Sequence, residues 1–558
     1  MDFGSFPNPA AKLYYNNNKT SGLRLVGGVY LEVQPIKNLS IKSALNIDGT
    51  HSTNRKYTPW YQVSSVQTDT TLTLAKKIDD PFTYVWDNTA TYKFNIGSQH
   101  SFTAMLGTSM QEERFHSTTA TRQGVKDYGD GSWYLGNGSD AGQTNAESVD
   151  QYRSFSLFGR LNYAYLQRYL FTATLRRDEA GIFPKDNRAD FFPSVGLGWI
   201  ISQEKFMENQ NIFQNLKLRG SWGKMGNSRI NSNVIAGVST GGNYSYVTPG
   251  GVIIPGANIT QKVPDNLLWE TMNEFDVALE GAVLNNRLSF EVDYYNRKTI
   301  SSIFNVRTNS ALGASNEYYL DNNADIVNKG FEFTLNWKDN IGDFKYSVGG
   351  NFTTNKNEVS LLKPGTLGIY SGAVNFIQTT YTTVGNPIGA FYGRQVVGIF
   401  QNQAEIDNYK NKEGIVIQPN AQPGDFKYQD TNGDGIINDY DRVYLGSPVP
   451  TYAFGINLGG SYKNFDLTVD MYGQGGNKIY NGKRFRQLGN ENYDQDFFNN
   501  RWHGEGTSNT YPSADLVTLD NKVANSWYVE SGDFFKIRNI QLGYTCPQKM
   551  VSKIKING

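Results

Sequence analysis

Apolar and polar side chains alternate strictly along many stretches of this 558-residue chain. Phe331–Lys338 reads FEFTLNWK, so every second side chain is apolar and the others are polar or charged. Phe275–Glu280 follows the same pattern apart from Ala278, and so does Leu288–Tyr295. Because successive side chains of a β-strand point to opposite faces, each stretch has one apolar, aromatic-rich face and one charged face. The repetition predicts an all-β fold, an antiparallel transmembrane β-barrel.

The alternating stretches come in pairs joined by very short turns. The expected hairpins are Leu23–Val33 with Leu39–Ile47, Thr91–Ile96 with Phe102–Gln111, Arg153–Tyr165 with Tyr169–Arg177, Phe275–Glu280 with Leu288–Arg297, Phe331–Trp337 with Phe344–Phe352, and Ala453–Tyr462 with Phe465–Tyr472. Long polar stretches separate the pairs: His116–Asp150, Asn227–Asp265, Ser301–Asn328, Leu361–Pro387, Gln401–Pro448 and Asn477–Ser531. Short periplasmic turns and long extracellular loops are typical of outer-membrane barrels, and we expect roughly sixteen to eighteen strands of ten residues each.

Composition narrows the class of protein further. The 52 basic and 52 acidic side chains cancel, which leaves no overall field to attract nucleic acid. No apolar run approaches the ~20 residues of a transmembrane helix. The single cysteine, Cys546, cannot form a disulfide within the chain. Met1–Gly4 lacks the features of a signal peptide, which an outer-membrane protein needs, so we expect an internal piece of a longer protein.

One segment has the spacing of a calcium-binding loop. Asp430–Asp441 reads DTNGDGIINDYD, with glycine at loop position 6, where the chain must turn sharply around the ion. An aspartate stands at position 12, where an EF-hand has glutamate and dockerin-type loops have aspartate. The candidate Ca²⁺ ligands are Asp430, Asn432, Asp434, the backbone carbonyl of Ile436, Asn438 and Asp441. The alternative is that Asn-Gly and Asp-Gly only form a turn; under either interpretation the segment orders a long loop.

Several motifs, in the same order along the chain, resemble those of one family. Gly424–Asp430 followed by Asn432–Gly435 resembles a signature of the SusC/RagA family of TonB-linked outer-membrane transporters. Further stretches similar to that family are Phe191–Trp199, Gly385–Gly393, Leu445–Gly455 and Phe534–Tyr544. The resemblance implies that residues 1–558 are the barrel portion of a TonB-dependent receptor of about 22 strands, without the plug domain, the TonB box and the last strand. We therefore expect the chain alone not to insert as a stable barrel.

The resemblance also implies a function and partners. It implies TonB-dependent active import of a nutrient, a glycan or oligosaccharide or else a peptide, across the bacterial outer membrane. The implied partners are a SusD-like surface lipoprotein, outer-membrane lipid, and TonB–ExbB–ExbD through the missing N-terminal region; nucleic acid is not among them. The charged residues expected to line the lumen are Arg153, Arg160, Glu274, Asp276, Glu291, Asp293, Glu332, Lys338, Asp466 and Asp470.

Two other functions remain as alternatives. A non-transporting surface barrel or adhesin would also use long polar loops. A secreted glycan hydrolase would need paired carboxylates across a cleft, but the chain has no GxSxG, HExxH or Walker motif, and its four histidines are scattered. We therefore expect no enzyme, no catalytic residue and no organic cofactor. Four aromatic loop residues could stack on sugar rings or pack within the loops: Trp133, Tyr134, Tyr244 and Tyr246.

Overall fold

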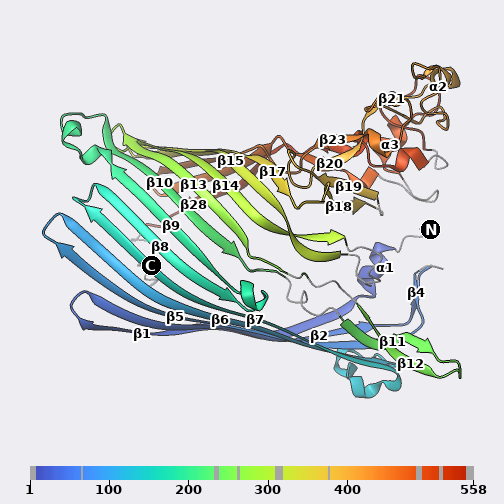
Figure 1. Cartoon of the computed structure of the whole chain (residues 1–558), viewed down its shortest axis with the longest axis horizontal. Helices are drawn as coiled ribbons and strands as arrows, with labels where there is room; N and C mark the ends of the chain where they lie inside the picture. Colours follow the sequence, from blue (N-terminus) through green and yellow to red (C-terminus); the bar gives the residue numbers. More distant parts are fainter. Residues whose placement is uncertain are drawn as a thin grey trace.

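Antiparallel strands build most of the chain, as the alternation predicts. The computed structural model describes residues 8–64, 67–230, 238–259, 264, 266–307, 318–374, 377–484, 493–514 and 519–547. Sixteen strands form one sheet that bends into a curved wall (Figure 1). In order across the sheet they are β1 (Asn17–Ile36), β2 (Leu39–Thr58), β5 (Thr73–Ile96), β6 (His100–Gln123), β7 (Ser139–Tyr165), β8 (Tyr169–Ala180), β9 (Ala189–Ile200), β10 (Phe213–Asn227), β13 (Glu270–Val283), β14 (Leu288–Arg307), β15 (Tyr318–Ile341), β16 (Phe344–Thr354), β24 (Tyr452–Tyr462), β25 (Phe465–Gly475) and β28 (Phe534–Tyr544), with β17 (Lys356–Leu362) pairing with β15.

All six predicted hairpins are present, and their short turns lie at one end of the wall. Two-residue turns join β1 to β2, β15 to β16 and β24 to β25. Each contains a residue with positive φ: Asn38 at 70°, Gly342 at 59° and Lys463 at 54°. A two-residue turn with positive φ matches the right-handed twist of the strands it joins, so these turns fix the register of the wall.

The strands extend much further toward the other end of the wall than predicted. β6 continues to Gln123 and β7 begins at Ser139, so much of the polar stretch His116–Asp150 is strand and not loop. β7 alone has 27 residues. The sequence there is rich in Ser and Thr and has no apolar face. A strand that projects beyond lipid needs no apolar face, because both of its faces meet water.

The two faces of the wall differ in polarity and in exposure. Phe275, Val277 and Leu279 on β13 lie on the apolar face and are 47%, 36% and 36% exposed. Register pairs apolar residues across neighbouring strands, for example Val292 of β14 with Phe333 of β15. An apolar surface that continues over so many strands is a lipid-facing surface. The opposite face carries the charges.

Small sheets occupy the end of the wall opposite the short turns. They are formed by β18 (Ile369–Val374), β19 (Ile377–Thr382), β20 (Phe391–Arg394) and β23 (Arg442–Gly446); by β21 (Val396–Ile399) and β22 (Phe426–Tyr428); by β26 (Lys478–Tyr480) and β27 (Val529–Ser531); by β11 (Val238–Val247) and β12 (Ile253–Ile259); and by β3 (Tyr61–Gln62) and β4 (Thr68–Asp69). Most of these strands lie within stretches predicted as loops, but β20 and β21 lie between the predicted loops Leu361–Pro387 and Gln401–Pro448. The sheet formed by β21 and β22 has an apolar core. Phe426 and Tyr428, for example, are buried against Ile399.

The helices are short and belong to the same region or to the start of the chain. They are α1 (Pro9–Tyr14), α2 (Gln403–Asn408) and α3 (Gln495–Asn500), each of six residues. Within the described ranges, no helix is both long enough and apolar enough to cross a membrane.

Candidate functional site

The charged face of the wall gathers nearly all of the residues predicted to line a lumen. Strand register places Asp293 opposite Glu332 and Ala278, and it places Asp470 opposite Asn457. Arg160 of β7 lies opposite Thr174 of β8, and Thr174 lies opposite Ser194 of β9. The register continues from Ser194 through β10 to Glu274 of β13, so Arg160 and Glu274 share one face. The residues that share this face are Arg160, Glu274, Asp276, Glu291, Asp293, Glu332, Lys338, Asp466 and Asp470. The prediction is confirmed for these residues.

Arg153 is the exception, and the prediction for it was wrong. Along β7 it shares the parity of Phe155 and Leu157, so it lies on the opposite face from Arg160. Its guanidinium contacts Glu112 of β6 at 3.1 Å, and Arg114 contacts the same carboxylate. The physical reason is the length of β7, which carries Arg153 beyond the apolar part of that face. There a charge meets water and a neighbouring carboxylate instead of lipid.

Arg219 of β10 is the centre of the largest charge network on the lumenal face. Its guanidinium contacts Asp276 at 2.6 Å, Glu280 at 2.7 Å and Glu291 at 2.6 Å, and it also contacts Asp293. Its five N–H donors explain how one side chain can serve carboxylates on β13 and β14 together. Asp276, Glu291 and Asp293 were predicted from the sequence to line the lumen, but Arg219 was not, because only the strand register brings β10 beside them.

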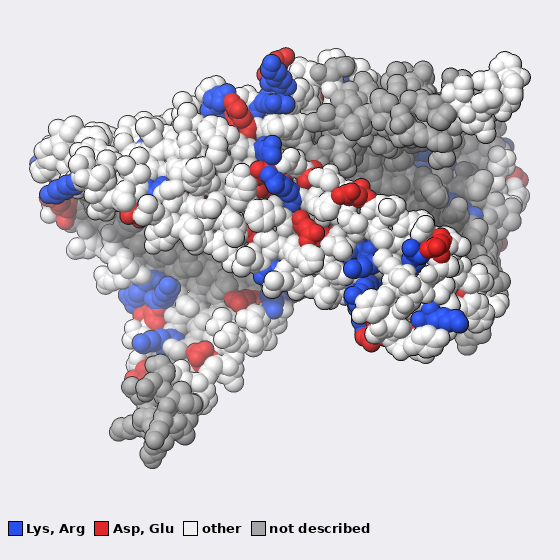
Figure 2. All heavy atoms as spheres, turned by 90° about the horizontal axis from the view of Figure 1, so that it is seen from below, with Lys and Arg blue, Asp and Glu red and all other residues white. Residues whose placement is uncertain are grey.

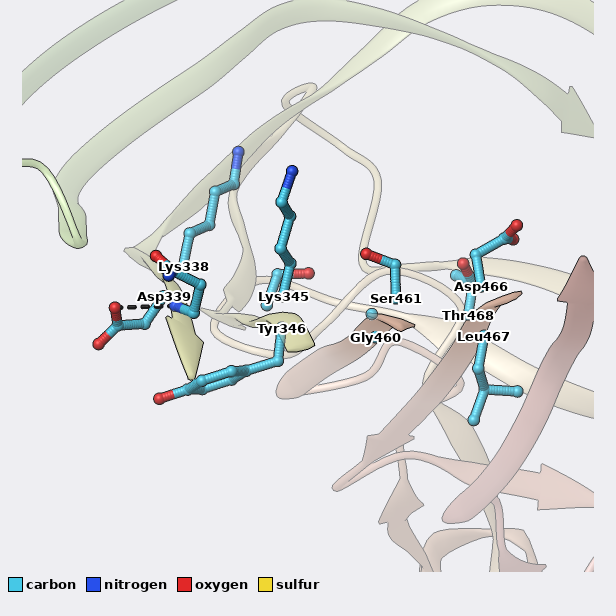
Figure 3. A pocket seen from close by; sticks show the side chains of 12 residues that line it. Lys338, Asp339, Lys345, Tyr346, Gly460, Ser461, Asp466, Leu467 and Thr468 are labelled. Atoms are coloured by element: carbon cyan, nitrogen blue, oxygen red, sulfur yellow. Dashed lines mark hydrogen bonds between the residues drawn. The ribbon is translucent and has the colours of Figure 1, made fainter. Parts of the chain in front are cut away.

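A hollow of about 490 Å³ lies against the same face, near the short turns. Figure 3 shows the alternation directly: Lys338, Lys345 and Asp466 point to one side of the wall, while Tyr346 and Leu467 point to the other. The hollow is therefore lined mainly by polar side chains from β15, β16, β24 and β25. It is suited to water and polar solutes.

Outside the lumen, charges of opposite sign lie next to one another. Figure 2 shows Lys and Arg beside Asp and Glu in small groups, with wide uncharged areas between the groups. On the outer face, Arg287 contacts Asp339 at 3.1 Å, and Asp339 lies opposite Tyr346. This face offers no single-sign patch to a polyanion such as nucleic acid.

The predicted calcium loop is a compact turn held by its own carboxylates. Asp430 accepts hydrogen bonds from the backbone N–H groups of Gly433 and Gly435, both at 2.8 Å. Asp441, fully buried, accepts from the N–H of Thr431 at 2.9 Å and from that of Asn438 at 2.8 Å. Gly433 and Gly435 have φ values of 74° and 81°, which only glycine adopts without strain.

The other predicted ligands belong to the same network. Asp434 accepts from the N–H of Ile436 at 2.9 Å and from the side chain of Asn432 at 2.8 Å. The Asn432 and Asn438 side-chain oxygens cap the N–H groups of Asp434 and Tyr440. Hydrogen bonds from the Asn432 side chain and from the Ile436 N–H lower the pKa of the Asp434 carboxyl.

The six predicted ligands of this loop are of the chemical type that Ca²⁺ binds, but their acidic side chains do not surround a common point. All six predicted ligands offer oxygen, which is the donor that Ca²⁺ takes. A carboxylate has about four lone-pair positions, and the hydrogen bonds to Asp430 and Asp441 leave some of them free. Within the described part of the chain, however, no three His, Cys, Asp or Glu side chains are placed to hold a metal together.

The aromatic residues predicted to stack on sugars divide into different environments. Trp133 is only 5% exposed and stacks on Tyr57 of β2 with 5.2 Å between ring centroids, so it packs against the wall. Tyr134 is exposed and lies under the guanidinium of Arg55. The side chains of Tyr244 and Tyr246 lie outside the described part of the structure.

Comparison with known proteins agrees with this architecture. The family described as TonB dependent receptor-like, beta-barrel matches residues 2–472. TonB-dependent receptor P26 of Formosa agariphila is 31% identical over 570 residues, which cover 99% of this chain and 55% of that protein. TonB-dependent receptor SusC of Bacteroides thetaiotaomicron is 26% identical over 96% of this chain and 51% of its own length. The chain thus spans about half the length of these relatives.

The fold is also that of a solved transporter. The structure of the RagAB peptide transporter superposes with a TM-score of 0.81 at 21% identity, covering 97% of this chain and 57% of that chain. The expected resemblance to SusC and RagA is confirmed. With its lipid-facing outer surface, charged inner face and short turns at one end, the chain belongs to the TonB-dependent receptor-like β-barrel family of the bacterial outer membrane.

Proposed function

We propose that the receptor containing this wall imports a nutrient, an oligosaccharide or a peptide, across the outer membrane with energy from TonB. The observation that carries the proposal is the division of the wall into a lipid-facing apolar surface and a lumenal surface of networked charges around Arg219. A polar lumen inside an apolar wall gives a hydrophilic solute a path through lipid. The relatives named SusC and RagAB are a TonB-dependent receptor and a peptide transporter.

The proposed partners follow from the same relatives. A SusD-like surface lipoprotein would cover the long-loop end, where the small sheets stand, and TonB–ExbB–ExbD would act from the periplasmic end, where the short turns lie. We also propose that the chain is not an enzyme, since the relatives are named as receptors and transporters. Release of reducing sugar or of new amino termini by the purified receptor would contradict that.

Uptake measured with and without TonB tests the import proposal. Cells that lack the receptor are complemented with the wild-type gene, and accumulation of fluorescent oligosaccharides and peptides is followed in tonB-positive and tonB-deleted backgrounds. We expect accumulation only when both the receptor and TonB are present. Receptor-dependent attachment to surfaces without any TonB-dependent uptake would favour the adhesin alternative instead.

We further propose that Asp430–Asp441 binds Ca²⁺ in a structural role. The support is the oxygen-only donor set and the position of the loop, which joins β22 to β23 and so connects two of the small sheets. The residues that would hold the ion are Asp430, Asn432, Asp434, Ile436, Asn438 and Asp441. The ion would add charge neutralisation to a turn that is already closed by hydrogen bonds.

Limited proteolysis with Ca²⁺ or with a chelator tests the structural role. We expect Ca²⁺ to slow cleavage near the loop in the wild type but not in the Asp430→Ala/Asp434→Ala double variant. Asp439→Ala is the matched control, because Asp439 lies in the same loop but pairs with Arg442 at 2.8 Å and is not a candidate ligand. Equal cleavage of the wild type with and without Ca²⁺ would leave only the turn interpretation.

A further inference from the structure

Four tyrosines cross the sheet formed by β18, β19, β20 and β23 in one row. Tyr370 lies opposite Tyr381 in the register of β18 and β19, and Tyr392 lies opposite Tyr444 in that of β20 and β23. The rings of Tyr370 and Tyr381 stack with 4.2 Å between centroids, and Tyr381 contacts Tyr392 at 4.9 Å. Residues opposite each other on paired strands share a face, so these side chains form one strip across the sheet. We call it the tyrosine row.

The tyrosine row faces away from the wall at the long-loop end. Ile369, next to Tyr370, is buried in a cluster with Ile326 and Val359, so the other face of the small sheet packs on the wall. Ile326 shares the lumenal face of β15 with Glu332 by strand alternation, and Figure 1 places β18 and β19 beside β17 at the long-loop end. The small sheet therefore covers the lumenal face at its long-loop end, and the tyrosine row borders the entrance to the lumen.

The exposed chemistry of the row combines apolar rings with hydroxyls. Tyr370 and Tyr444 are each 46% exposed. Burial raises the pKa of Tyr381, Tyr392 and Tyr444 above the ordinary tyrosine value, so their hydroxyls stay protonated. No hydrogen bond to another part of the described chain engages any of the four hydroxyls. A surface of rings with free hydroxyls is apolar and hydrogen-bonding at once.

We propose that the tyrosine row is a stacking subsite for a neutral oligosaccharide at the entrance of the lumen. A sugar ring has an apolar C–H face that packs on an aromatic ring and a rim of hydroxyls that exchange hydrogen bonds with phenols. The row itself carries no charge, and the neighbouring Arg442 is already paired with Asp439. A peptide, with its charged termini, finds no unpaired counter-charge in the row. The inference rests on the proposed import function and selects the oligosaccharide as its substrate.

Titration of the purified full-length receptor with a defined panel tests the assignment. The panel contains neutral hexasaccharides of glucose, galactose, mannose and xylose, and a matched set of hexapeptides. We expect at least one hexasaccharide to bind, with affinity reduced about tenfold or more by Tyr370→Ala and by Tyr381→Ala. Tyr370→Phe keeps the ring and should retain most of the affinity. Tyr128→Ala is the control, since Tyr128 is exposed but lies in another loop.

Gly368 provides a variant that disturbs the row without removing a ring. A Cβ atom there would come within 2.3 Å of the Tyr381 ring, so Gly368→Ala should displace that ring and weaken binding. Unchanged near-ultraviolet dichroism outside the tyrosine signal, together with unchanged heat-modifiable mobility, establishes that each variant is folded.

The outcomes separate this inference from the import proposal. Binding of hexapeptides that depends on Tyr370 and Tyr381 would overturn the oligosaccharide assignment while leaving import intact. Failure of every hexasaccharide to bind, or binding that Tyr370→Ala and Tyr381→Ala leave unchanged, would overturn the tyrosine row as a subsite. Tyrosine-dependent hexasaccharide binding in a receptor without TonB-dependent uptake would support the subsite and defeat the import proposal alone.

Discussion

The wall and the small sheets at its long-loop end place their apolar residues in opposite environments. On the wall, Leu106 and Leu197 lie on the outer face and are largely exposed in the polypeptide by itself. In the small sheets, Phe426 and Tyr428 are buried, and so is Phe400 directly after β21, as in a water-soluble domain. The two regions are therefore adapted to different solvents. The outer face of the wall is apolar because it contacts lipid, whereas the small sheets bury their apolar side chains because they are surrounded by water.

Truncating a core residue of the small sheets should separate the two regions most clearly. Phe426 is 1% exposed and packs against Ile399 and Tyr428, so Phe426→Ala should cost about 3–5 kcal/mol locally. We expect rapid proteolysis of the segments around β21 and β22, with the heat-modifiable mobility of the barrel unchanged. Loss of that mobility would mean that the wall and the small sheets unfold as one cooperative unit.

A charge on the outer face tests the lipid side of the comparison. Phe333 lies on the apolar face of β15, beside Val292 and Phe352. Phe333→Arg should destabilise the receptor in lipid by about 2–4 kcal/mol, the cost of arginine near the bilayer midplane. The matched control is Thr334→Arg, one residue further and on the lumenal face, which should have little effect. Unfolding by urea in lipid vesicles measures both, and equal effects would contradict the assignment of the two faces.

Sequence reasoning succeeded on the wall because each strand carries its own signal. The alternation in Phe331–Lys338 is local, and the turn at Lys463 needs only two residues. The prediction that Arg153 lines the lumen was wrong. Alternation shows which residues of a strand share a face, but it does not show where along the strand the lipid-facing part ends.

The small sheets could not be predicted from the sequence, because contacts between residues far apart in the chain hold them together. The N–H of Phe426 donates to the Asn521 side chain 95 residues away, and Asn521 also donates to Asp425. No local pattern announces such contacts. The tyrosine row arises in the same way, from the register of four short strands. The spacing in Asp430–Asp441 predicts a calcium loop, but spacing alone does not decide between an ion site and a turn.

Removing the centre of the lumenal charge network should have a smaller effect than either change above. Arg219→Met leaves Asp276, Glu280, Glu291 and Asp293 without their shared cation, which destabilises through repulsion among the carboxylates. Because these side chains are partly exposed, we expect about 1–2 kcal/mol, less than for a buried pair. Urea unfolding at low and high salt measures it. Salt should reduce the loss, and Arg219→Lys should recover part of it; a salt-independent loss would point to packing instead.

The smallest expected effect is the pH response of the loop Asp430–Asp441. It distinguishes the small-sheet region from the wall, because we do not expect the wall to show the same response. Hydrogen bonds from Asn432 and from the Ile436 N–H lower the pKa of Asp434 below its ordinary value of 3.8. A carboxyl with a lowered folded-state pKa stabilises the fold above its unfolded-state pKa, and it loses that contribution as pH falls through the folded-state value. Amide hydrogen exchange at Ile436 should therefore be slow and constant from pH 7 to 5, after correction for the intrinsic rate, and should accelerate only below about pH 4. Asp434→Asn should abolish the transition. An acceleration already near pH 6 would mean that another group controls the loop, since Asp434 is fully ionised there.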